Sequence, residues 1–258
     1  MRLTVLNDNL AGKKCCGEHG LSFLIEGEKK ILFDAGSSDL FLKNHEILGF
    51  SPEDVELIVL SHGHWDHGNG LRFIRSKKLI CHPECFIKRY KKDNDKYNGL
   101  ALSLEDARKS FDLMLSKEPY QISENIVFLG EIPRMNDFEA KKTPFYKEGR
   151  KEDYIMDDSG IAIKSDKGLI VVTGCSHAGI CNIIEYAKKV TCAKKVYAVL
   201  GGFHLMEDDE ITKRTTEYFK KEKIEKIYPT HCTELPALAR FYDMFKIKRI
   251  HSGDIIEL

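Results

Sequence analysis

The stretch Ser61-His62-Gly63-His64-Trp65-Asp66-His67-Gly68-Asn69-Gly70 decides how this chain is interpreted. It follows directly on the apolar run Val55–Leu60, which predicts a buried β-strand. A turn at the end of a strand can direct several side chains to one point, whereas a helix spreads them over different faces. Imidazole nitrogens and carboxylate oxygens are ligands that suit zinc. We therefore expect one or two divalent metal ions here, zinc first and manganese or iron next, and we expect them to serve catalysis.

Composition limits the classes of protein to consider. Lys plus Arg and Asp plus Glu both number 40, so the formal net charge of the 258 residues is zero, which argues against a nucleic-acid partner. No segment approaches the roughly 20 apolar residues of a membrane span, and the N-terminus lacks the pattern of a signal peptide. A cytoplasmic protein is expected, with its eight cysteines reduced. The absence of a CxxC pair argues against a structural zinc finger.

Short apolar runs alternate with helical patterns in both halves of the chain. Strands are predicted at Leu3–Leu6, Leu21–Ile25, Ile31–Phe33, Val55–Leu60, Gly160–Lys164, Leu169–Val172, Val196–Leu200, Ile224–Tyr228, Lys248–His251 and Ile255–Leu258. Helices are predicted at Leu40–Leu48, Ile180–Lys189, Ile211–Lys221 and Leu235–Phe245. This order favours two sheets covered by helices, a four-layer α/β sandwich formed by residues 1–258 as one domain.

Residues 83–157 interrupt this alternation. They are rich in Lys, Asp, Asn, Glu and Pro, with one helix predicted near Ser103–Leu115 and one short strand near Ile126–Leu129. A long, partly irregular insertion in a compact domain is usually a lid or a binding element. We therefore predict that 83–157 is a lid within the single domain.

The histidine-rich stretch resembles the HxHxDH motif of the metallo-β-lactamase superfamily. The resemblance implies the αββα fold, with His62 and His64 on a first metal ion and Asp66 and His67 on a second. It also implies that later strand ends supply further ligands. His177 in VVTGCSHAG corresponds to the third ligand of the first metal, and His231 in IYPTHCT to the last ligand of the second.

The fourth motif departs from the superfamily pattern. Most of its hydrolases carry a bridging aspartate there, but this chain has Gly201-Gly202-Phe203-His204-Leu205, with no carboxylate until Glu207. The carboxylate that would bridge to the second metal ion is therefore missing from this motif. His204 is a candidate either to replace the missing ligand or to contact substrate, so we consider it catalytic. Asp34 in ILFDAG corresponds to an aspartate that supports the metal loop, and a plain turn residue is the alternative.

Four further motifs narrow the resemblance to one branch of the superfamily. They are GEHGLSFLIE at 17–26, GEIPR at 130–134, GCSHAG at 174–179 and GGFHL at 201–205. Together they resemble the archaeal-type dihydropteroate synthase group that acts on 4-(β-D-ribofuranosyl)aminobenzene 5′-phosphate. The similarity extends over essentially the whole chain.

Two other side chains are candidate substrate contacts. Arg134 in GEIPR suits bidentate contact with a phosphate, although an ordinary salt bridge is the alternative. His19 precedes a predicted strand and could face the metal ions. Cys175 and Cys232 flank ligand histidines, and we expect them to be packing residues.

Several functions compete. The first is a metal-dependent hydrolase of a small phosphorylated substrate, in which the metal activates a water that Asp66 orients or deprotonates. The second is a transferase that joins a hydroxymethyl-dihydropterin diphosphate to the ribofuranosylaminobenzene phosphate and releases diphosphate. Aromatic residues such as Tyr90, Tyr97 and Phe145 would then hold the flat pterin. A non-catalytic metal-binding protein is the third. A di-iron oxygen- or NO-reducing protein is disfavoured, because its motif carries Glu where this chain has His64. A homo-oligomer stays open.

Overall fold

The computed structural model describes residues 1–258, which divide into two compact units. Unit 1 comprises Met1–Lys117, Thr143–Asp157 and His251–Leu258, and unit 2 comprises Glu118–Lys142 and Asp158–Ile250. Each unit has its own sheet, its own helices and its own apolar core. None of the helices is both long enough and apolar enough to cross a lipid bilayer.

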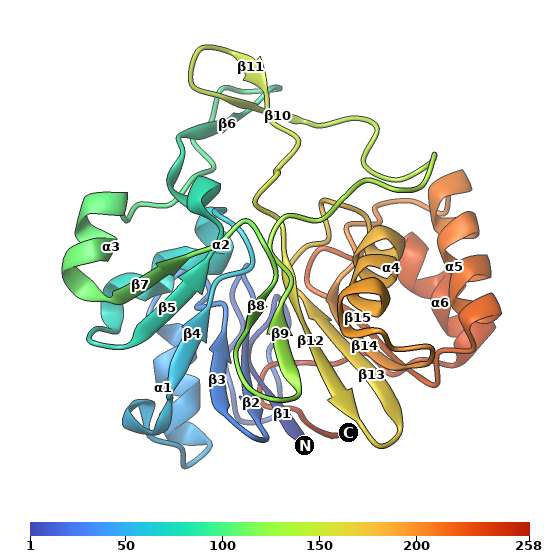
Figure 1. Ribbon diagram of the computed structural model, residues 1–258, viewed down its shortest axis with the longest axis horizontal. Helices are drawn as coiled ribbons and strands as arrows, with labels where there is room; N and C mark the ends of the chain where they lie inside the picture. The colour runs from blue at the N-terminus through green and yellow to red at the C-terminus, as the bar shows by residue number, and fades with distance from the viewer. The chain divides into compact units, whose positions relative to one another are not determined.

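Unit 1 is built on a seven-stranded sheet in the order β16-β1-β2-β3-β4-β5-β7 (Figure 1). Its strands are β1 (Arg2–Asn7), β2 (Ser22–Glu26), β3 (Lys30–Phe33), β4 (Leu57–Val59), β5 (Lys78–Cys81), β7 (Asp112–Leu115) and β16 (Ile255–Glu257). The strands from β16 to β3 pair antiparallel, and those from β3 to β7 run parallel. The strands predicted at Leu3–Leu6, Leu21–Ile25 and Ile31–Phe33 are therefore confirmed.

An apolar row crosses the parallel part of this sheet. Leu32 on β3 is opposite Ile58 on β4, which in turn is opposite Leu79 on β5. All three side chains are buried in one core cluster, which the side chain of Phe41 from α1 (Leu40–Ile47) also joins. This packing fixes the ends of β3 and β4 at one edge of the sheet, where the candidate ligands follow.

The helices and turns of unit 1 are short. They are α1, η1 (Pro52–Asp54), α2 (Trp65–Gly68), η2 (Asn69–Phe73), η3 (Pro83–Phe86) and α3 (Leu104–Ser110). The helix predicted near Ser103–Leu115 is only half right, because α3 ends at Ser110 and the chain continues as β7. Ser103 caps the start of α3 by accepting a hydrogen bond from the Asp106 amide. Phe111 is extended, so the next residues pair with β5 instead of continuing the helix.

A small separate sheet lies within the predicted insertion. It pairs β6 (Arg89–Lys91) with β10 (Phe145–Lys147) and β10 with β11 (Lys151–Glu152), at the top of Figure 1. Other parts of 83–157 are strands of the two large sheets, β7 in unit 1 and β9 (Ile126–Phe128) in unit 2. That this segment acts as a lid stays a prediction.

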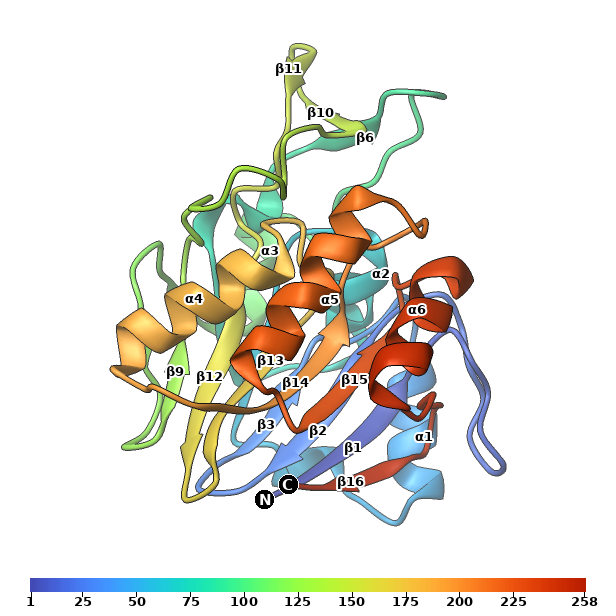
Figure 2. The same ribbon diagram turned by 90° about the vertical axis from the view of Figure 1, so that its right-hand side faces the viewer.

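Unit 2 has a six-stranded sheet in the order β15-β14-β13-β12-β9-β8, with three helices along it (Figure 2). Its remaining elements are β8 (Tyr120–Gln121), β12 (Gly160–Ser165), β13 (Gly168–Thr173), α4 (Ile180–Thr191), β14 (Val196–Gly202), α5 (Glu210–Glu222), β15 (Lys226–Thr230) and α6 (Leu235–Phe245). The three strands β13, β14 and β15 are parallel neighbours. Their carboxyl ends therefore lie at one edge, and each is followed by a candidate ligand.

One predicted strand is wrong. Residues Lys248–His251 form no strand, and β16 pairs with β1 instead. Only Ile250 of this stretch is buried among residues 248–251. The amide of His251 donates to the Asp254 carboxylate rather than to a neighbouring strand.

Candidate metal centre

Asp34 organises the start of the metal loop, residues 61–68, in unit 1. It follows β3, and Ser61 follows β4 at the adjacent strand end. The buried carboxylate of Asp34 accepts hydrogen bonds from the amide and the hydroxyl of Ser61, both at 2.7 Å, and contacts His67 Nδ1 at 2.7 Å. Asp34 has φ of 57°, a strained conformation that this set of bonds compensates.

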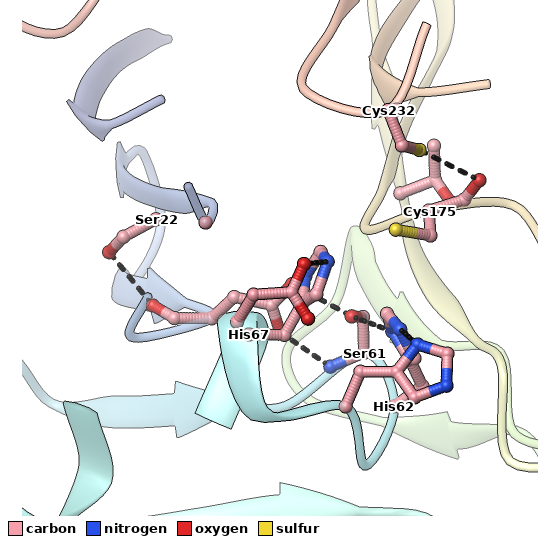
Figure 3. Close-up of polar contacts among 12 residues, drawn as sticks. Ser22, Ser61, His62, His67, Cys175 and Cys232 are labelled. Atoms are coloured by element: carbon pink, nitrogen blue, oxygen red, sulfur yellow. Dashed lines mark hydrogen bonds and ion pairs between the residues drawn. The ribbon is translucent and has the colours of Figure 1, made fainter. Parts of the chain in front are cut away.

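The same bonds determine where two imidazole protons lie. The Ser61 hydroxyl gives its only proton to Asp34, so it accepts the 2.9 Å hydrogen bond from Nδ1 of His62. Nδ1 of His67 likewise donates to the Asp34 carboxylate. Nε2 of both rings is then left with a lone pair, which is the form that binds metal. Figure 3 shows Ser61 beside His62 and His67 with these contacts.

Four candidate ligands of the metal loop come together. Nε2 of His62 lies 2.9 Å from Nδ1 of His64, and the rings of His62 and His67 are 4.3 Å apart. A carboxylate oxygen of Asp66 lies 3.9 Å from Nε2 of His67. All four side chains are buried. His62 and His64 precede α2, while Asp66 and His67 belong to it, so the turn predicted from the sequence includes one helical turn.

Burial keeps His62 neutral. It lowers the pKa of His62 well below its usual value, and the neighbouring His67 and His64 lower it further. A neutral imidazole is the form that coordinates metal, so the site disfavours the proton that would compete with the ion.

Asp157 supports the metal loop from a direction that the sequence did not predict. Its carboxylate accepts a hydrogen bond from the Gly63 amide at 2.7 Å and another from Nη2 of Arg89 at 2.8 Å. Arg89 is completely buried, with Asp153 3.4 Å from its Nε. Burial alone lowers the pKa of Arg89, but the carboxylates of Asp157 and Asp153 outweigh it and raise this pKa. The only sequence signal was the acidic pair Asp157-Asp158 before a predicted strand.

His19 reaches the metal loop from the loop before β2. Its Nε2 lies 3.1 Å from a carboxylate oxygen of Asp66, and its ring is 5.5 Å from Trp65. The side chain is 59% exposed, which leaves His19 open to solvent on one side and in contact with Asp66 on the other.

In unit 2 the candidate ligands follow three parallel strands. His177 comes after β13, His204 after β14 and His231 after β15. The rings of His177 and His204 lie 4.3 Å apart. His204 has φ of 49° and His231 φ of 51°, so both adopt a left-handed conformation that is uncommon outside glycine. Nδ1 of His204 is buried with no hydrogen-bond partner, as expected of a ring nitrogen meant for a ligand.

Two thiols lie among these histidines. The side-chain donor atoms of Cys175, His231 and Cys232 lie within 4.8 Å of one another, as do those of Cys175, His177 and His204. Figure 3 shows the sulfur of Cys232 directed at the main-chain oxygen of Cys175, 3.5 Å away. Burial raises the pKa of Cys232, but hydrogen bonds from Cys175 and His204 and the nearby His231 bring it well below its usual value.

Two carboxylates fasten the loop that carries His177. Asp158 accepts a hydrogen bond from the amide of Ala178 at 2.8 Å. Glu139 accepts from the amides of Cys181 and Asn182 in the first turn of α4, each at 3.0 Å. Burial raises the pKa of Glu139 in spite of these bonds. The carboxylates in this unit thus act on the backbone beside the ligands.

Arg134 is the candidate phosphate contact in unit 2. Its Nη1 donates to the carbonyl of Ile132 at 2.6 Å, a local contact in unit 2. Its role at a phosphate stays a prediction.

The donor sets fit divalent metal ions. Unit 1 offers three imidazoles and a carboxylate with two ring nitrogens held in the binding form. Unit 2 offers two triads whose donor atoms lie within 4.8 Å of one another, Cys175 with His231 and Cys232, and Cys175 with His177 and His204. Which of these side chains share one ion stays a prediction.

Comparison with known proteins decides the family. The chain is 36% identical over 263 residues to an uncharacterised protein of Methanocaldococcus jannaschii, covering 98% of this chain and 99% of that one. Residues 17–119 match the family model described as the metallo-beta-lactamase superfamily. The chain belongs to the metallo-beta-lactamase superfamily. The resemblance inferred from HxHxDH is thereby confirmed.

Two further proteins are similar to this chain. One is the 7,8-dihydropterin-6-methyl-4-(beta-D-ribofuranosyl)-aminobenzene-5'-phosphate synthase of M. jannaschii, 36% identical over 93% of this chain and 90% of the synthase. The other is the crystal structure of a metal-dependent hydrolase of the beta-lactamase superfamily, 28% identical with a TM-score of 0.90 over 100% of this chain and 99% of that one.

These similarities confirm the metallo-β-lactamase fold predicted from the sequence. The chain is an enzyme of the hydrolase or transferase type, and its superfamily binds metal ions. The interpretation as a non-catalytic binder is set aside.

Proposed function

We propose that this enzyme uses zinc to act on a small phosphorylated substrate, with hydrolysis as its reaction. The observation that carries the proposal is the hydrogen-bonded chain Asp34–Ser61–His62, which leaves Nε2 of His62 ready for a metal ion. Imidazole-rich sites of this kind suit zinc, and a bound zinc ion supplies Lewis acidity and activates water near neutral pH.

Side chains of the metal loop hold and orient the reactants in this proposal. His62, His64, Asp66 and His67 serve as ligands in unit 1, and His177 and His231 serve as ligands in unit 2. Asp66 also accepts the proton of the attacking water. His19 lies 3.1 Å from Asp66 and is largely exposed, so it can pass that proton to solvent. His204, with its unpartnered Nδ1, is the candidate hydrogen-bonding group for the substrate.

A transferase is the second candidate, favoured by the 36% identity to the M. jannaschii synthase. The arylamine nitrogen would attack the methylene carbon of a hydroxymethyl-dihydropterin diphosphate, and diphosphate would leave with the electrons of the C–O bond. The amine proton would pass to Asp66. Phe145, 4.7 Å from the His64 ring, presents an aromatic surface beside the metal loop. Tyr90, which stacks on Tyr146 at 5.3 Å and meets Tyr97 edge-on at 5.5 Å, offers another.

One experiment tests the proposal and separates the two reactions. Purified protein is analysed for bound metals, then assayed on phosphodiesters, phosphomonoesters and the pterin diphosphate, the last with and without the arylamine. A hydrolase releases diphosphate or phosphate without the arylamine, whereas a transferase requires it. Protein that contains no metal after expression with zinc, manganese and iron available contradicts both.

His62→Ala tests the carrying observation. We expect metal content and activity to fall at least about 100-fold, because groups that merely orient a ligand already contribute 10–100-fold. His251→Ala is the control, since the half-buried side chain of His251 belongs to neither group of candidate ligands and forms an ion pair with the nearby Asp254. Wild-type activity in the His62→Ala variant would contradict the proposed mechanism.

A further inference from the structure

The two thiols of unit 2 occupy places that suggest more than packing. Cys175 belongs to both groups of donor atoms in this unit, one with His231 and Cys232 and one with His177 and His204. Cys175 is buried at 4% exposure. A thiol surrounded by three imidazoles is an unusual environment for a residue that only fills space.

Gly202 leaves room for one of the sulfurs. A Cβ atom at this position would lie 2.5 Å from Sγ of Cys232 and 2.6 Å from the carbonyl oxygen of Gly174. The sulfur therefore occupies space that any side chain at residue 202 would take. The hydrogen bonds from the Gly202 amide to Gly174 and from the Ser176 hydroxyl to Gly202, at 2.9 and 2.6 Å, hold these loops together around it.

The ligand loops of unit 2 lack negative charge that the thiols could supply. The loops 174–179, 201–205 and 230–233 contain no Asp or Glu, and the carboxylates that follow the last two loops, Glu207 and Glu234, are exposed. Neutral imidazoles alone leave the charge of a divalent ion uncompensated. The two buried acids beside the His177 loop are both engaged with backbone amides, Asp158 with that of Ala178 and Glu139 with those of Cys181 and Asn182. Thiols that lose their protons on binding supply negative charge in the same place.

We propose that Cys175 and Cys232 are metal ligands, coordinating as thiolates the ion or ions that the unit 2 histidines hold. This inference rests on the proposed function, since it assumes a metal enzyme, and it adds which atoms bind. Each thiol releases one proton to solvent as its sulfur–metal bond forms. Thiolate ligands favour zinc and disfavour manganese and magnesium, which prefer oxygen. The thiols thereby replace the missing carboxylate of the 201–205 motif.

X-ray absorption of the wild-type zinc protein tests this without any mutation. Zinc–sulfur bonds are about 2.3 Å and zinc–nitrogen bonds 2.0–2.1 Å, so the two kinds of ligand are resolved. We expect a sulfur shell beside the nitrogen and oxygen shell. A shell of nitrogen and oxygen alone in protein that carries stoichiometric zinc overturns the inference, while the proposed function stands.

Cobalt substitution assigns the sulfurs. Cobalt(II) bound to thiolate shows a sulfur-to-metal charge-transfer band in the near ultraviolet, and we expect the wild-type protein to show it. Cys175→Ser should remove most of the band and Cys232→Ser should weaken it. Cys192→Ser is the matched control, because Cys192 is an exposed thiol of the same unit. Equal bands in all variants overturn the inference, and failure of the wild type to bind cobalt or zinc at all counts against the proposed function instead.

Discussion

The metal loop of unit 1 and the ligand loops of unit 2 are built by different means. In unit 1 the Asp34 carboxylate bonds directly to a ligand ring, His67, and through Ser61 it fixes a second, His62. In unit 2 the carboxylates Asp158 and Glu139 bond backbone amides. The ligand positions there depend on left-handed residues and glycines.

The difference shows two ways to prepare a site before its ion arrives. Buried carboxylates set the ring orientation and protonation in unit 1, at the cost of desolvating charge. Backbone strain and small residues set the positions in unit 2, which leaves room for sulfur. Unit 1 should therefore be most sensitive to loss of a charge, and the predictions below test that sensitivity.

Asp157→Ala should cause the largest loss of stability. It leaves the buried guanidinium of Arg89 without its closest partner, and breaking a buried ion pair costs about 3–5 kcal/mol. The free energy of unfolding of the metal-free protein, measured in urea, checks this. Asp95→Ala is the matched control, because it removes an Arg–Asp pair with Arg150 that is exposed and should change stability little. Similar losses in both variants contradict the role of burial.

Asp34→Asn should lower zinc affinity by about 10–100-fold, because it weakens the bonds that orient His67 and Ser61. Asp158→Asn is the corresponding change in unit 2. It should cost less than about 10-fold, because an asparagine oxygen can still accept the Ala178 amide hydrogen bond. Competition with a chromophoric chelator measures both affinities. A larger effect at Asp158 than at Asp34 would reverse the contrast between the units.

Gly63→Ala should destabilise unit 1 by about 1–3 kcal/mol through overpacking. The added Cβ would lie 1.9 Å from the carbonyl oxygen of Cys85, a backbone atom that cannot move aside alone. Gly27→Ala serves as the control, since the nearest atom to its Cβ is 3.4 Å away on the side chain of Met1. Thermal or urea unfolding compares the two. If Gly63→Ala is as stable as the wild type, the backbone at residue 63 can move away from the Cys85 carbonyl, and the prediction of overpacking is wrong.

His45→Phe tests how much a buried histidine outside the metal site contributes to the pH dependence of the free energy of unfolding. Burial lowers the pKa of His45, which is 2% exposed in α1 and stacks on Phe50 at 5.4 Å. The unfolded chain binds this proton near pH 6.5 and the folded chain does so only at lower pH, so stability falls as pH drops below 6.5. The contribution is at most about 1.4 kcal/mol per pH unit. The variant should show a shallower loss between pH 6.5 and 5 in metal-free protein, and an unchanged slope would contradict the prediction.

The sequence predicted those features that depend on neighbouring residues. Most strands and helices could be predicted from apolar runs and the turn residues that bound them. The metal loop could be predicted from three histidines and an aspartate that follow a strand. The strand prediction for Lys248–His251 was wrong, because a single buried isoleucine among polar residues resembles the alternation of a strand. In the structure the amide of His251 donates to the Asp254 side chain instead of to a neighbouring strand. Local pattern alone does not show which partner a backbone amide takes.

The supporting contacts could not be predicted, because they join residues far apart in the chain. Arg89 and Asp157 are separated by 68 positions, and Gly63 and Asp157 by 94. In the sequence, Arg89 and Asp157 each resemble an ordinary surface charge. Cys175 and Cys232 each lie beside a candidate ligand histidine in the sequence, but they are 57 positions apart, and only the fold shows that their sulfur atoms come together with His231. The sequence thus yields candidate ligands more readily than the residues that hold them.

The dipeptide Asp157-Asp158 has a consequence for how this chain can change in length. Asp157 accepts a hydrogen bond from the Gly63 amide within unit 1, and Asp158 accepts one from the Ala178 amide within unit 2. The boundary between the units therefore falls between two residues whose side chains are both hydrogen-bonded. An insertion or deletion at this boundary shifts one carboxylate away from its loop. The turn at Gly149 has open space around it and can accept added residues. Tags, inserted domains and new chain ends therefore belong at Gly149, and the boundary between the units is a poor place to cut.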